Sequence, residues 1–87
     1  MNDLIASYDE FADVLYLSLG SPVKAIAHTD IDNLLWRESV FDHSTVGVTI
    51  LDYAEDWRER RDNLAYRLAP RLHLSEQQVL EHLPVIR

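Results

Sequence analysis

The stretch Ser-Tyr-Asp-Glu-Phe-Ala-Asp-Val-Leu-Tyr-Leu-Ser-Leu, residues 7–19, decides the fold class of this chain. In its second half, Leu15 and Leu17 fall on one side of an extended chain, and Tyr16 falls on the other. Alternation with a period of two, in a run with β-branched and aromatic side chains, is typical of a strand. We therefore predict a strand that begins at Val14.

A turn precedes this strand. Asp9 and Asp13 flank the segment Glu-Phe-Ala, and short acidic side chains accept hydrogen bonds from nearby backbone N–H groups. A second extended run, residues 4–8, lies upstream of the turn. The whole segment therefore predicts a β-hairpin with a loop of about five residues.

The hairpin also carries a resemblance to a known family. Residues 8–17, Tyr-Asp-Glu-Phe-Ala-Asp-Val-Leu-Tyr-Leu, and residues 46–52, Val-Gly-Val-Thr-Ile-Leu-Asp, resemble the small bacterial family described as domain of unknown function 2283. The resemblance covers about residues 4–52. It implies a small antiparallel meander followed by a helix, and it transfers no catalytic residue to this chain. The residues of the structural motif are Tyr8, Asp9, Asp13, Leu15, Tyr16 and Leu17.

Three further strands are expected after the hairpin. Residues 24–30 alternate, and their small side chains predict that the C-terminal helix packs closely above them. Residues 34–39 and 45–51 are extended runs bounded by turn residues. Turns about ten residues apart favour an antiparallel meander of four to five strands, because parallel strands need a helix-length crossover between them.

A helix is expected after the sheet. Apolar side chains recur at steps of three and four residues over residues 53–69, and Pro70 is expected to end the helix at or before Ala69. Asp52 and Glu55 have the spacing of a capping box at the start of this helix.

A second, short helix is expected over residues 75–83, because Ser75 and Gln78 also have capping-box spacing. The fold class is therefore α+β: an antiparallel meander over residues 1–52, covered on one face by the first helix and followed by the second.

The composition sets limits on the kind of protein. The chain has 87 residues, which we expect to form one domain, and it has no cysteine, which excludes disulfides and thiolate metal sites. The N-terminal residues lack the features of a leader, and no apolar run approaches the ~20 residues of a membrane span. We expect a soluble cytoplasmic protein that uses no cofactor.

The net charge of −7 is confined to the sheet half of the chain. Residues 1–52 hold nine acidic and two basic side chains, whereas residues 53–87 hold six of each. An acidic excess of this kind keeps a small domain soluble, and it also suits a basic protein partner. An antitoxin-like protein that neutralises a basic toxin is therefore one alternative function.

Two chemical alternatives stay open at this point. His28, Asp30 and His43 are candidate metal ligands, because imidazole and carboxylate suit zinc or a similar ion. Asp9 and Asp13, with His28 and His43, are the candidates if the chain is a small enzyme. The chain has only two glycines and no glycine-rich phosphate loop, so we expect no catalysis and assign no catalytic residue.

Nucleic-acid binding is a further alternative that the charge pattern opposes. The two predicted helices could imitate a helix-turn-helix, and five arginines lie on or near the first one. The second helix would read the bases, but it carries no arginine or lysine, so its attraction to phosphate would be weak.

Association with other protein chains is the function that the sequence favours, with a homo-oligomer as the expected form. A small sheet has two edges with unpaired backbone groups, and so short a chain cannot cover every aromatic side chain. Aromatic and arginine residues carry many interfaces. The expected partner-binding residues are Tyr53, Trp57, Tyr66, Arg67, Leu72, Leu80 and Leu83.

Overall fold

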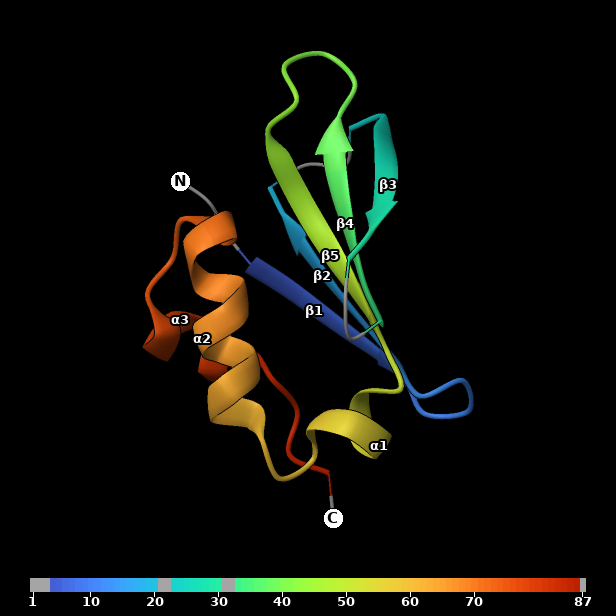
Figure 1. Cartoon of the computed structure of the whole chain (residues 1–87), viewed down its shortest axis with the longest axis vertical. Helices are drawn as coiled ribbons and strands as arrows, with labels where there is room; N and C mark the ends of the chain where they lie inside the picture. Colours follow the sequence, from blue (N-terminus) through green and yellow to red (C-terminus); the bar gives the residue numbers. More distant parts are fainter. Residues whose placement is uncertain (1–3, 21–22, 31–32, 87) are drawn as a thin grey trace.

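A computed structural model describes residues 4–20, 23–30 and 33–86 of the chain. Five antiparallel strands form one sheet: β1 (Leu4–Asp9), β2 (Val14–Leu19), β3 (Ala25–Thr29), β4 (Leu34–Ser39) and β5 (Thr45–Leu51). Three helices follow them: α1 (Tyr53–Trp57), α2 (Arg61–Leu72) and α3 (Glu76–Leu80). The predicted α+β class, with its antiparallel sheet, is confirmed (Figure 1).

The order of the strands departs from a simple meander. The order across the sheet is β1-β2-β5-β4-β3, so β5 lies between β2 and β4 and pairs with both. Burial explains this order. Both Val48 and Ile50 of β5 are fully buried, as are Leu15 and Leu17 of β2, and such strands take central positions. The strand β3, which buries none of its side chains, lies at the edge.

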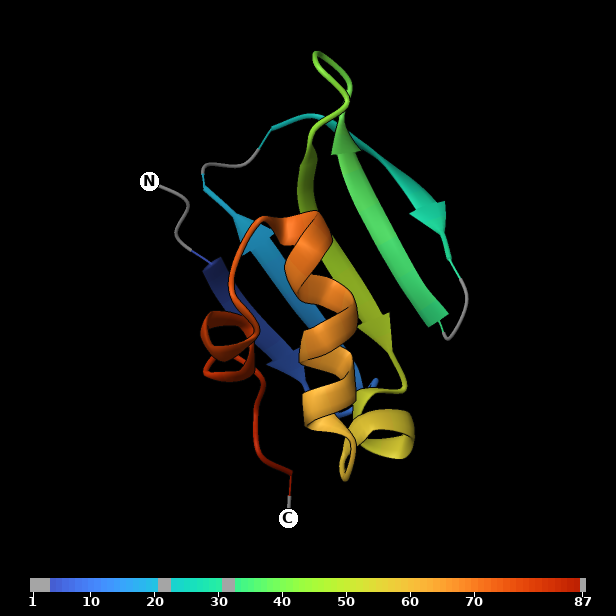
Figure 2. The ribbon, with the colours of Figure 1, turned by 60° about the vertical axis from the view of Figure 1, so that its left-hand side comes forward.

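The helices cover one face of the sheet. Figure 2 shows α2 lying across the middle of the sheet, with α3 beside it and β3 at the far margin. Leu64 and Leu68 of α2 share one buried cluster with Leu17 and Val48 of the sheet. The helix therefore packs on the centre of the sheet, and the small side chains of β3 lie beyond its reach.

The predicted helix over residues 53–69 is two helices. Residues 58–60 separate α1 from α2, and this break lets both helices face the same core. Tyr53 and Trp57 of α1 are buried, and so are the leucines of α2.

The expectation that Pro70 ends the helix at or before Ala69 is wrong. Pro70 lies within the last turn of α2, which continues to Leu72. His73 then adopts a left-handed conformation with φ 57°, and its N–H donates to the Pro70 carbonyl while the Leu74 N–H donates to the Ala69 carbonyl. These two bonds satisfy the carbonyls of Ala69 and Pro70, so the helix ends at the left-handed His73 and not at the proline.

The C-terminal segment folds back onto its own chain. The predicted capping box of α3 is confirmed: the Gln78 N–H donates to Ser75 Oγ at 3.1 Å, and the Ser75 N–H donates to Gln78 Oε1 at 2.9 Å. Arg61 of α2 donates to the Leu83 carbonyl at 2.6 Å, and Leu83 is buried. Of the described helices, none is long and apolar enough to cross a membrane.

Asp13 connects the first hairpin to the start of α1. Its carboxylate accepts hydrogen bonds from the N–H groups of Ala54 at 2.7 Å and Glu55 at 3.1 Å, and from the Tyr8 hydroxyl at 2.7 Å. It therefore supplies the cap expected from Asp52, whose side chain instead accepts a bond from Asn33. The first turn of α1 is thus held by a residue 41 positions earlier in the chain.

These contacts shift the pKa values of Asp13 and Tyr8 in opposite directions. Burial disfavours the charge on Asp13, but the bonds from Ala54, Tyr8 and Glu55 and the charge of Arg58 outweigh it, so the pKa of the carboxyl lies below its usual value. The bond to Asp13, together with burial, raises the pKa of the Tyr8 phenol to about 12.

Replacing Asp13 with alanine should lower the free energy of unfolding at pH 7 by about 1–2 kcal/mol, because α1 loses its cap. Since the pKa of Asp13 is lower in the folded chain, its contribution is present at neutral pH and disappears as the pH falls through the usual 3.8 toward the folded value. Urea unfolding should therefore show the two proteins converging in acid.

The matched control is Glu10→Ala in the same turn, because the Glu10 side chain is exposed. It should change the free energy of unfolding by less than about 0.5 kcal/mol. Equal effects at the two positions would contradict the capping role of Asp13.

Candidate functional site

The candidate catalytic residues do not converge on one site, and most of them have structural contacts. Asp9 accepts hydrogen bonds from the N–H groups of Phe11 and Ala12 and so holds the β1–β2 turn, while Asp13 caps α1. His43 lies in the β4–β5 turn with φ 61°. The fourth candidate, His28, lies on β3. The structure does not bring these residues together as one site.

The candidate metal ligands do not converge either. His28 Nε2 lies 3.2 Å from Glu38 Oε1, and the guanidinium of Arg71 lies 3.5 Å from Glu38 and 4.0 Å from Asp30. The same guanidinium stacks 4.2 Å from the centre of the Trp36 ring. In the described part of the chain, no three His, Asp or Glu side chains form a group that could hold a metal ion. These charges connect the end of α2 to β3 and β4.

The expected partner-binding residues are mostly internal. The single hydrophobic core contains Tyr53, Trp57, Leu72 and Leu83, and each of these side chains is at most 2% exposed. These four side chains complete the core of a single chain and offer no surface to a partner. The remaining three reach the surface, with Tyr66 exposed and Arg67 and Leu80 half-buried.

The arginines of the helices also have internal roles. The guanidinium groups of Arg60 and Arg67 lie 4.6 and 5.9 Å from the centre of the Trp57 ring. Arg61 donates to backbone carbonyls, and Arg71 pairs with acids of the sheet. These contacts involve four of the five arginines on or near the predicted first helix.

The outer edge of β3 is the first surface feature of interest, because no strand of the described chain pairs with it. β3 pairs only with β4, and Figures 1 and 2 show it at the margin, away from the helices. The Val40 N–H donates to the Lys24 carbonyl at 3.1 Å, and the Asp30 N–H donates to the Leu34 carbonyl at 2.7 Å. Since hydrogen-bonding direction alternates along a strand, every second residue points away from β4. The residues whose backbone groups point outward are Ala25, Ala27 and Thr29.

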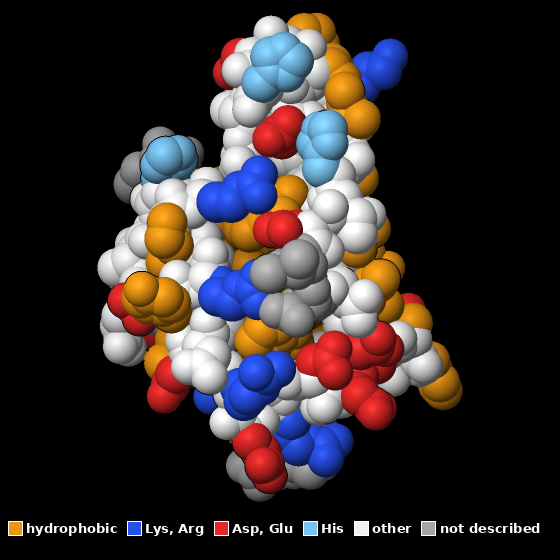
Figure 3. All heavy atoms as spheres, in the orientation of Figure 1, with side chains coloured by type: hydrophobic (Ala, Val, Ile, Leu, Met, Phe, Trp, Pro, Cys, Tyr) orange, Lys and Arg blue, Asp and Glu red, His pale blue; other side chains and the backbone are white. Residues whose placement is uncertain are grey.

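The side chains of β3 leave this edge unprotected. None of the five is buried or carries a fixed charge, and Ile26 is 50% exposed. Edge strands usually carry a lysine, a proline or a bulge that prevents pairing with another chain. None of the five residues of β3 is a lysine, a proline or part of a bulge, and the nearest lysine, Lys24, lies just before the strand. Figure 3 shows hydrophobic side chains along the margin where β3 and β4 lie.

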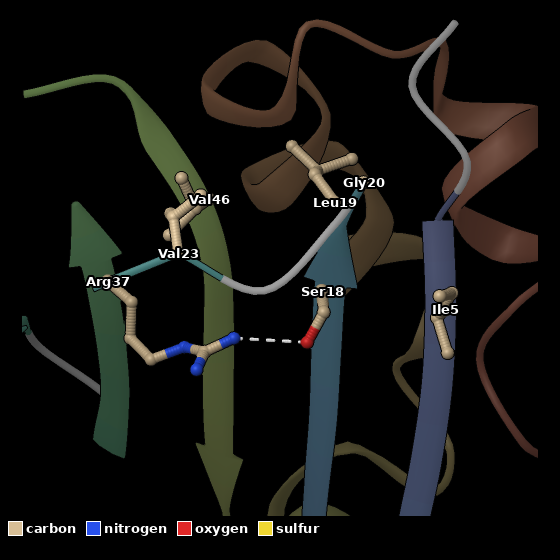
Figure 4. A pocket seen from close by; sticks show the side chains of 7 residues that line it. All are labelled: Ile5, Ser18, Leu19, Gly20, Val23, Arg37 and Val46. Atoms are coloured by element: carbon tan, nitrogen blue, oxygen red, sulfur yellow. Dashed lines mark hydrogen bonds between the residues drawn. The ribbon is translucent and has the colours of Figure 1, made fainter. Parts of the chain in front are cut away.

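A hollow on the uncovered face of the sheet is the second feature. It has a volume of about 340 Å³ and lies over the ends of β1 and β2 and the neighbouring parts of β4 and β5 (Figure 4). Arg37 extends from β4 across β5, and its Nη2 donates to Ser18 Oγ on β2 at 3.0 Å. The other lining residues are Ile5, Leu19, Gly20, Val23 and Val46.

Gly47 makes the path of Arg37 possible. A Cβ atom at this position would lie 2.5 Å from the Leu17 carbonyl oxygen and 2.6 Å from Arg37 Nη2, closer than side chains tolerate. A bulge between Arg37 and Glu38 in the β4–β5 pairing lies at the same place. The hollow therefore depends on a glycine in a central strand, where this residue is otherwise unfavourable.

Sequence reasoning expected open sheet edges but did not identify β3 as the exposed one, and it missed the hollow. The absence of charge between Lys24 and Asp30 was visible in the sequence, but the small residues there suggested helix packing. Arg37, Gly47 and Ser18 are far apart in the sequence and carry no joint signal. A lone glycine inside a strand pattern is the one available indication of a close approach.

Comparisons with family models, curated proteins and solved structures found no match for this chain. The resemblance to the domain of unknown function 2283 family therefore stays a prediction.

Replacing Gly47 with alanine should lower the free energy of unfolding by about 1–3 kcal/mol, because the new methyl group meets a backbone carbonyl and a guanidinium. Combining it with Arg37→Ser should reduce this penalty, since only the conflict with the Leu17 carbonyl then remains. Thr49→Ser, on the same strand and face, is the control. Urea unfolding of the four proteins measures the effect, and a Gly47→Ala protein as stable as the wild type would contradict the packing described.

Proposed function

We propose that this chain is a non-catalytic protein that acts by association, and that it forms a homo-oligomer in which two copies pair through β3. The observation that carries the proposal is the open, uncharged edge of β3. Six of its backbone groups point to solvent, and a strand that buries none of its side chains gains little stability from its own chain. A strand of a second chain would satisfy these groups.

The sequence of β3 suits pairing with itself. In an antiparallel pair centred on Ala27, this residue faces its own copy, and Ala25 faces Thr29. These are the residues whose backbone groups point outward, so the register uses all of them in hydrogen-bonded pairs. At each end of the paired strands, Lys24 of one copy faces Asp30 of the other copy. Two chains of net charge −7 repel each other, but this register brings opposite charges together.

The structural roles of the chemical candidates support a non-catalytic protein. Asp9 holds a turn, Asp13 caps a helix, and His28 lies beside Glu38. Each of these polar side chains has a contact that stabilises the fold, so none needs a reaction to explain it.

A basic protein partner is the second candidate. Figure 3 shows acidic side chains gathered at the end of the molecule that holds the β1–β2 turn and α1. Exposed acids of this region include Glu10, Asp52 and Glu55. An antitoxin-like protein would use such a surface to attract a basic toxin, and the encounter would weaken with salt.

The association proposal predicts that Ala27→Pro produces a monomer. Proline removes an N–H that points away from β4, so the hydrogen bonds within the chain's own sheet stay intact while the edge loses a donor. Ala27→Val is the matched control, because valine keeps the N–H and favours a strand. Light scattering after size exclusion should give a dimer mass for the wild type and Ala27→Val, and a monomer mass for Ala27→Pro.

Charge exchange tests the register independently. Lys24→Asp and Asp30→Lys should each weaken the dimer, because each places like charges opposite each other at both ends. An equimolar mixture of the two variants should restore it, since every facing pair is then opposite in charge. A wild type that stays monomeric at all accessible concentrations, or a folded Ala27→Pro protein that stays dimeric, would refute pairing through β3.

A further inference from the structure

The hollow on the uncovered face holds a positive charge, that of Arg37, which no described residue neutralises. Arg37 makes one hydrogen bond, to the neutral hydroxyl of Ser18, and forms no ion pair within the described chain. Its Nε is buried and has no hydrogen-bond partner there. A guanidinium has five N–H donors, and a partly buried one is normally paired with a carboxylate or phosphate. This contrasts with Arg71, which lies beside two acids.

The walls of the hollow are apolar. Ile5, Val23 and Val46 line the hollow beside the Arg37 side chain drawn in Figure 4, and Leu19, which also packs against the hydrophobic core, borders it. A volume of about 340 Å³ lies in the range of small-molecule sites, which combine an apolar lining with a few polar groups. The hollow therefore combines an apolar lining with one cationic side chain, that of Arg37.

We propose that this hollow binds a small monocarboxylate with an apolar tail. The planar guanidinium can donate two parallel N–H bonds to one carboxylate, and the tail would lie along the aliphatic side chains of Ile5, Val23 and Val46. A polyanion is disfavoured, because the site has a single cation and the chain carries a net charge of −7. A free acid of medium length, such as a C6 to C10 fatty acid, fits both the charge and the lining.

The proposal does not depend on association through β3. The lining side chains come from β1, β2, β4, β5 and the residues that flank β2 and β3, and none is one of the three outward-facing residues of β3. A failure of pairing would therefore leave the site unaffected.

The test is a titration of the full-length protein with octanoate, followed by ¹⁵N–¹H NMR that includes the arginine Nε–H signals. Octan-1-ol has the same tail without the charge, and acetate has the charge without the tail. We expect saturable binding of octanoate with a shift of the Arg37 Nε–H signal. Both controls should bind at least about tenfold more weakly, because a charge-assisted hydrogen bond and the buried tail each contribute that much.

Variants separate the site from adventitious binding. Arg37→Gln should weaken octanoate at least about tenfold. Val46→Phe keeps the arginine and narrows the hollow, so it should also weaken octanoate, and it serves if Arg37→Gln does not fold. Tyr16→Phe lies on the same face outside the hollow and should leave the affinity unchanged.

Three results would overturn the proposal. One is the absence of saturable octanoate binding below its micellar concentration. Another is equal affinity for octanoate and octan-1-ol, which would reveal an apolar cleft without charge recognition. The third is undiminished octanoate binding by folded Arg37→Gln and Val46→Phe proteins, which would place the ligand elsewhere.

Discussion

The helix α2 buries its apolar side against the centre of a five-stranded sheet, and this contact determines which surfaces the rest of the chain leaves open. Leu64, Leu68 and Leu72 are fully buried in one cluster with the leucines of β2 and with Val48 and Ile50 of β5. A helix of twelve residues covers only the middle of such a sheet. The edge strand β3 and the opposite face therefore stay outside the core.

The C-terminal residues finish the core within the same chain. Tyr53 donates its hydroxyl hydrogen to the Pro84 carbonyl, and Val79 and Leu83 are buried beside α2. Arg61 bonds the carbonyls of Leu80 and Leu83. The two surfaces proposed for pairing and for ligand binding both belong to the sheet: a neutral edge at β3 and a cationic hollow at Arg37. The two are separate, so one could bind a second copy while the other binds a small acid.

Local signals in the sequence predicted the local structure well. Alternation gave the strands of the first hairpin, and the spacing of Ser75 and Gln78 located the start of α3. Features that depend on distant residues could not be predicted. The cap of α1 comes from Asp13 rather than from Asp52, and no pattern within α1 indicates a partner 41 residues away. The strand order could not be predicted for the same reason. Alternation shows which side chains of a strand face the core, but it does not show which strands are neighbours.

The candidate surfaces show the same limit more strongly. Apolar and aromatic side chains at helical spacing suggested a partner surface, but Trp57 and Leu72 turned out to be core, since periodicity does not distinguish a helix face that meets a partner from one that meets its own sheet. Arg37 is recognised as a candidate binding residue only from the structure, which shows that its side chain crosses Gly47 and reaches the Ser18 hydroxyl.

Amide hydrogen exchange at several protein concentrations tests the central claim, that a second copy completes the sheet at β3. The Ala27 N–H points away from β4, whereas the His28 N–H points toward it. The account predicts that exchange at Ala27 slows as the concentration rises, with Ala25 and Thr29 following it, while His28 is already protected in dilute solution. Rapid exchange at Ala27 at every concentration would contradict the account.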